Sequence, residues 1–98
     1  MSFLNKKILI TGSTKGLGKE LAIEFDKLGS NLVIVGRSKK IIYEMKRTFK
    51  NAKKHLFFDG DLMSETVSKN LISKINKKLK KIDIIIHCLG GSFGINSP

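Results

Sequence analysis

A glycine-rich stretch at residues 11–18, TGSTKGLG, constrains this chain more than any other feature. It lies between an apolar run and an amphipathic stretch, a setting that predicts a strand, a loop and a helix. In such a loop Gly12 permits a tight turn, Gly16 lets the backbone approach a phosphate, and Gly18 lets the helix pack closely on the sheet. The amides and dipole of the helix N-terminus attract an anion. The stretch therefore predicts a dinucleotide phosphate loop, with a ligand-free glycine turn as the alternative.

Short apolar runs alternate with amphipathic stretches along the chain. Strands are predicted at residues 8–11, 31–35, 56–58 and 83–88. Helices are predicted between them, with apolar faces formed by Leu17, Leu21, Phe25 and Leu28, then Ile41, Ile42, Met45 and Phe49, then Val67, Leu71, Ile75 and Leu79. Gly29 is expected to end the first helix, and Ser38 and Ser64 to cap the others. The pattern predicts an α/β fold at residues 1–98, a Rossmann-type doubly wound parallel sheet of order 3-2-1-4 that is truncated after the fourth strand.

The end of the second strand bears on the choice of dinucleotide. NAD-binding folds of this type place a carboxylate there, which binds the ribose hydroxyls. Here the position is Gly36, and Arg37 and Ser38 follow. A guanidinium binds a phosphate bidentately, and Lys15 adds a second cation within the glycine loop. We expect NADP(H) rather than NAD(H), although both cations could simply be two of nineteen basic residues.

The spacing T-G-x-x-x-G-x-G resembles the short-chain dehydrogenase/reductase family. Asp61-Leu62 follows the third strand, where family members bind and cover the adenine, and residues 83–90, DIIIHCLG, resemble the family's D-h-h-h-N-N-A-G. His87, Cys88 and Leu89 stand where the family has Asn, Asn and Ala. The resemblance covers essentially the whole chain, but only the family's N-terminal, cofactor-binding half. It implies cofactor contacts from Gly12, Ser13, Thr14, Lys15, Gly16, Leu17, Gly18, Arg37, Ser38, Asp61, Leu62, Cys88, Leu89 and Gly90.

The family's chemistry is hydride transfer at a carbonyl or alcohol carbon, by a serine and a Tyr-x-x-x-Lys pair located beyond the fourth strand. The one tyrosine here, Tyr43, is followed by Arg47 rather than Lys. His87 and Cys88 are adjacent on a strand, so they point to opposite faces and do not form a nucleophile pair. We therefore assign no catalytic residue. We expect the cofactor-binding half of an oxidoreductase, inactive alone; a stand-alone nucleotide-binding module and a basic nucleic-acid-binding protein are the alternatives.

Charge and apolar patterning limit the partners. The chain has 19 Lys+Arg against 8 Asp+Glu, but the lysines are scattered without interleaved aromatics, which favours a solvated surface over nucleic-acid binding. One cysteine excludes an intramolecular disulfide, and a lone His55 offers no metal site. The N-terminal apolar run is too short for a signal or a membrane span, so a cytoplasmic protein is expected. Residues 84–86 would form an unprotected edge strand, which calls for a homo-oligomer or a missing C-terminal half. The family's substrate loops lie beyond the fourth strand, so this sequence does not predict the substrate.

Overall fold

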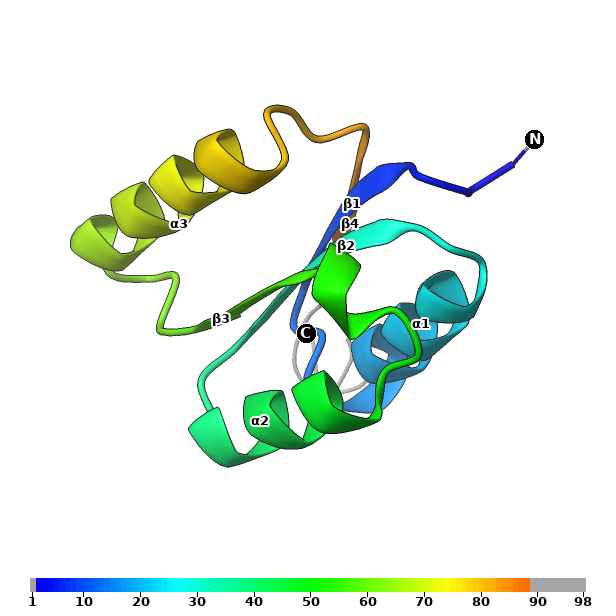
Figure 1. The fold of residues 1–98 in the computed structure, drawn as a ribbon. Coiled ribbons are helices and arrows are strands. Elements are labelled where there is room, and N and C mark those ends of the chain that lie inside the picture. Colours follow the sequence, from blue (N-terminus) through cyan, green and yellow to red (C-terminus); the bar gives the residue numbers. More distant parts are fainter. Residues whose placement is uncertain (1, 89–98) are drawn as a thin grey trace, which may run out of the picture.

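Four parallel strands form one sheet in the computed structural model, which describes residues 2–88 of the chain (Figure 1). The strands are β1 Lys7–Thr11, β2 Asn31–Gly36, β3 Leu56–Asp59 and β4 Ile84–His87. The helices are α1 Gly16–Lys27, α2 Lys39–Thr48 and α3 Glu65–Lys78, with a short 3-10 turn, η1, at Ala52–Lys54. The sheet order is β3-β2-β1-β4, and each strand pair is parallel. The predicted α/β fold and strand order are confirmed.

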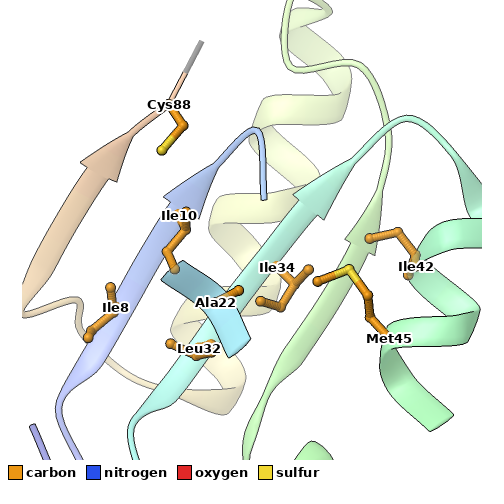
Figure 2. Packing of buried hydrophobic residues seen from close by; sticks show 8 residues of the cluster. All are labelled: Ile8, Ile10, Ala22, Leu32, Ile34, Ile42, Met45 and Cys88. Carbon is orange, nitrogen blue, oxygen red and sulfur yellow. The ribbon is translucent and has the colours of Figure 1, made fainter. Parts of the chain in front are cut away.

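Both faces of the sheet are covered by helices. Helices α1 and α2 lie on one side and α3 lies on the other (Figure 1). Alternate residues of β2 supply the two layers: Leu32 and Ile34 belong to the cluster under α1 and α2, and Val33 and Val35 to the cluster under α3. In the first cluster α1 contributes Ala22, while α2 contributes two larger side chains (Figure 2). The central strand β2 is apolar on both faces because helices cover it on both sides.

The predicted apolar face of α1 is wrong at its two ends. Leu17 and Leu28 are 45% and 51% exposed, whereas Gly18, Ala22 and Asp26 are the buried residues of the helix. Ala22 packs in the core cluster and Gly18 lies against the backbone of the preceding loop, so the buried line of the helix passes through these small residues and not through Leu17 or Leu28. Leu21 and Phe25, the middle of the predicted face, are partly buried and pack against the core cluster.

Helices α2 and α3 pack as the periodicity predicts. Ile42 and Met45 of α2 are buried, as are Leu71 and Ile75 of α3. The Ser38 hydroxyl accepts a hydrogen bond from the Ile41 amide, and the Ser64 hydroxyl accepts one from the Val67 amide. Both predicted N-caps are thus confirmed. Gly29, with φ of 85°, follows α1 as the predicted helix stop.

Strand β4 is held to β1 by side chains as well as by the ladder. The Thr11 hydroxyl lies 2.8 Å from His87 Nδ1 and accepts a hydrogen bond from the Cys88 amide. His87 is exposed and Cys88 is 8% exposed, which confirms that the two side chains point to opposite faces. Within residues 2–88 β4 pairs only with β1, and Ile85 is 66% exposed. The predicted open edge is therefore present in this part of the chain.

A buried carboxylate–imidazole pair joins α1 to the start of β3. Asp26 Oδ1 lies 2.7 Å from His55 Nε2, and the Leu32 amide donates to His55 Nδ1. Since Nδ1 accepts a hydrogen bond, Nε2 carries the proton and the ring is neutral. Burial lowers the pKa of His55 below its usual 6.5, against the opposing effects of Asp26. His55 is thus a structural residue, a role that the sequence did not indicate.

Candidate functional site

A cleft opens at the carboxyl ends of β1, β2 and β3, with a volume of about 520 Å³. Parallel α/β sheets bind ligands at this edge, where the loops and helix N-termini gather. The volume lies within the range that holds small molecules and cofactors. The segments that follow β1, β2 and β3 line the cleft, together with the end of β2 and the first turn of α2. The lining residues are Gly12, Thr14, Lys15, Val35, Gly36, Arg37, Ser38, Ile41, Gly60, Asp61, Leu62 and Met63.

The loop after β1 requires glycine at its turn and at its closest contact. Gly12 has φ of 66° and Gly16 has φ of 59°, in the left-handed region that other residues rarely adopt. A Cβ at Gly18 would overlap the carbonyl oxygen of Gly12. The tight turn expected at Gly12 is confirmed. The close approach expected at Gly18 is present too, although its partner is the loop backbone.

Ser13 fastens this loop to β2. Its hydroxyl accepts a hydrogen bond from the Val35 amide at 2.8 Å and donates to the Val35 carbonyl at 3.3 Å. The Ser13 amide also donates to that carbonyl. Ser13 is fully buried and does not line the cleft, so its side chain holds the loop in place and does not face a ligand.

The N-terminus of α1 is available to an anion. Its N-cap, Lys15, has extended backbone angles, and no side chain within residues 2–88 caps it. The first amides of the helix can therefore donate hydrogen bonds to a ligand, and they lie at the positive end of the helix dipole. Lys15 itself is exposed on the cleft wall.

The end of β2 supplies a second cation and no carboxylate. Arg37 is exposed and lines the cleft, as Lys15 does. The Gly36 carbonyl accepts a hydrogen bond from the Gly60 amide, and Ser38 is the N-cap of α2. Two cations thus share a cleft in which, among residues 2–88, Asp61 is the one lining carboxylate.

The loop after β3 is fixed by its own hydrogen bonds. Asp61 Oδ1 accepts from the Met63 amide at 2.9 Å, and the Ser68 hydroxyl donates to the Leu62 carbonyl. Leu62 is half-buried, while Met63 is 91% exposed at the cleft mouth. These bonds hold the Asp61 carboxylate and the Leu62 side chain at the cleft.

The cleft gathers half of the predicted contact residues. Gly12, Thr14, Lys15, Arg37, Ser38, Asp61 and Leu62 line it, whereas Ser13, Gly16, Leu17, Gly18 and Cys88 do not. Leu89 and Gly90 lie outside the described residues. The sequence did not indicate Val35, Ile41, Gly60 or Met63, which line the cleft through tertiary packing; an apolar residue in the first turn of α2 was the available signal for Ile41.

Other kinds of site find little support in the described part of the chain. Residues 2–88 contain no group of three or more His, Cys, Asp or Glu side chains placed to bind a metal. No helix in this range is both long enough and apolar enough to cross a membrane. Tyr43 is 62% exposed on α2, with the Arg47 guanidinium 5.7 Å from its ring centre. It lies outside the cleft.

Comparison with known proteins identifies one family. The short chain dehydrogenase pattern matches residues 6–97. A protein named dehydrogenase/reductase SDR family protein 7-like, from Dictyostelium discoideum, is 34% identical over 91 residues, which cover 87% of this chain and 29% of that protein.

Solved structures agree with the sequence match. A short chain dehydrogenase from Bacillus anthracis superposes with a TM-score of 0.83 at 30% identity, over 93% of this chain and 37% of that one. An L-sorbose reductase from Gluconobacter frateurii, complexed with NADPH and L-sorbose, superposes with a TM-score of 0.77 at 26% identity, over 87% and 33%. The chain spans about a third of the length of the relatives that it matches.

Proposed function

Because the chain belongs to the short-chain dehydrogenase family, we propose that it is the NADP(H)-binding half of an oxidoreductase. The observation that carries this proposal is the pair of cations, Lys15 and Arg37, in one cleft with glycine at the position of the usual carboxylate. The family's cofactor is a nicotinamide dinucleotide, which supplies hydride transfer at a carbonyl or alcohol carbon.

The phosphate loop fits the pyrophosphate of such a cofactor. The turn at Gly12 and the uncapped amides of α1 present donors to an anion, and Ser13 holds the loop against β2. The Ser13–Val35 hydrogen bonds restrain the loop, and a restrained loop loses less conformational entropy when it binds a ligand.

The extra phosphate of NADP(H) suits the end of β2. A guanidinium at Arg37 binds a phosphate through two parallel hydrogen bonds, and Lys15 adds a point charge. A carboxylate at position 36 would repel that phosphate, and Gly36 carries no such group. The relative that is complexed with NADPH has the same fold over the matching region, which agrees with this assignment.

The adenine is assigned to the wall after β3. One Asp61 oxygen is occupied by the Met63 amide, so the other oxygen is assigned to the amino group of the base. Leu62 and Ile41 line the cleft and offer apolar surface to the adenine ring. These roles extend what the family resemblance implies for Asp61 and Leu62.

Residues 1–98 are not expected to catalyse the reaction by themselves. The family's proton transfer needs a Tyr-x-x-x-Lys pair, and Tyr43 is followed by Arg47 and lies outside the cleft. The function assigned to this chain is to bind the cofactor and orient its adenosine half.

The test is a calorimetric comparison of NADPH and NADH binding to the wild-type chain and to Arg37→Asp. Loss of a charged hydrogen-bonded partner is worth about 1.5–3 kcal/mol, so NADPH should bind about 10- to 150-fold more weakly to the variant. Arg47→Asp is the matched control, because Arg47 is the other arginine and does not line the cleft. If the Arg37 variant keeps its preference for NADPH, or if folded wild-type chain binds neither nucleotide, the proposal is wrong.

A further inference from the structure

Thr14 occupies the space in which a side chain at position 36 would lie. An ideal Cβ built on Gly36 would overlap the Thr14 methyl group and lie 2.6 Å from its hydroxyl oxygen. It would also lie 2.9 Å from the Thr14 Cβ. Non-bonded carbons pack at about 3.5–4.0 Å, so these contacts are repulsive. The glycine loop and the end of β2 therefore interlock at this point.

Rotation of the Thr14 side chain cannot remove the overlap. The position of a Cβ follows from the backbone alone, and the Cβ of Thr14 is itself too close. The preceding residue is held in place, since Ser13 makes hydrogen bonds to both polar backbone groups of Val35. Thr14 is 7% exposed, so it has little space into which to move.

We propose that Thr14 is a specificity-determining residue that closes position 36 to every side chain and so reserves this corner of the cleft for the 2′-phosphate of NADP(H). The proposal rests on the proposed function, and it adds that selectivity belongs to a pair of residues. Position 36 is where a carboxylate would bind the ribose hydroxyls of NAD(H). With Thr14 in place, that carboxylate has no room.

The effect of a substitution at position 36 therefore depends on which residue stands at position 14. Gly36→Asp alone introduces a side chain into an occupied space, so the variant is destabilised and gains little affinity for NADH. Thr14→Gly removes the obstructing Cβ, and only then can a carboxylate at position 36 reach the ribose. Thr14→Ala removes the methyl and the hydroxyl but keeps the Cβ at 2.9 Å, so it should relieve the overlap only in part.

The steric part is tested without any nucleotide, by the thermal midpoints of Gly36→Ala combined with Thr14→Gly or Thr14→Ala. Overpacking in a small domain should lower the midpoint of Gly36→Ala by about 5–15 °C. Thr14→Gly should restore more than half of that loss relative to Thr14→Gly alone, and Thr14→Ala should restore less than Thr14→Gly does, because its Cβ remains at 2.9 Å. Equal midpoints for wild type and Gly36→Ala would overturn the interlock, whether or not the chain binds a dinucleotide.

The selectivity part uses calorimetry with adenosine 2′,5′-bisphosphate and AMP, because the described cleft holds the adenosine half. Wild type should prefer the bisphosphate, Gly36→Asp should bind both weakly, and the double variant Thr14→Gly/Gly36→Asp should prefer AMP by about tenfold or more. If Gly36→Asp alone already prefers AMP with an unchanged midpoint, Thr14 does not determine selectivity. If wild type shows no preference for the bisphosphate, the proposed NADP(H) function fails instead, while the midpoints still judge the interlock.

Discussion

Replacing Asp26 with Asn should unfold much of this chain at moderate temperature, although the two side chains are nearly the same size. Asp26 accepts hydrogen bonds from the amides of Lys50 and Asn51, at 2.7 and 2.9 Å, and from His55 Nε2 at 2.7 Å. An asparagine offers one oxygen and one NH2 group. Whichever way its amide is oriented, the NH2 group faces at least one of these donors.

The magnitude follows from the burial of the group. Asp26 is 3% exposed, and its hydrogen bonds are buried or partly buried. An unsatisfied buried donor costs about 1–3 kcal/mol, and each remaining bond weakens because its acceptor is no longer charged. We expect a loss of about 2–4 kcal/mol of unfolding free energy. In a domain of this size the thermal midpoint falls by about 8–30 °C.

The assay is thermal unfolding by circular dichroism at pH 7, with Asp83→Asn as the control. Asp83 likewise accepts a hydrogen bond from a backbone amide, that of Lys7 at 2.9 Å, but at an exposed position. Its variant should lose much less stability, since water can replace the lost bond. Midpoints that fall equally in both variants would refute the argument from burial.

Two further predictions concern the pH dependence of stability and the packing of the glycine loop. Burial lowers the pKa of His55, so below about pH 6.5 the unfolded chain binds a proton that the folded chain does not. The unfolding free energy should therefore fall, by at most about 1.4 kcal/mol per pH unit, until the pH reaches the lowered pKa. Denaturant titrations from pH 7.5 to pH 5 should show this slope in wild type and a flatter one in His55→Gln; parallel slopes would contradict it. Gly18→Ala should weaken NADPH binding and lower the thermal midpoint, because the added methyl group would overlap the Gly12 carbonyl, whereas Glu20→Ala, at an exposed position of α1, should do neither.

Local patterns were sufficient for the elements and their order. The apolar runs, the capping residues Ser38 and Ser64 and the glycine at the end of α1 act within a few residues of the chain, and the structure confirms each of them. Because right-handed crossovers leave few topologies for such a pattern, the order of the strands followed as well. The glycine loop and Arg37 could be assigned to one edge of the sheet for the same reason.

Only the tertiary structure shows which residues from distant parts of the chain contact each other. Periodicity alone could not show that α1 rests on Ala22 rather than on Leu17, since this depends on how closely the helix approaches the sheet. The Ser13–Val35 and Asp26–His55 contacts join residues 22 and 29 positions apart, and no local signal pairs them. A sequence shows which groups are present, but the direction in which a buried polar group points depends on the partners that packing brings to it.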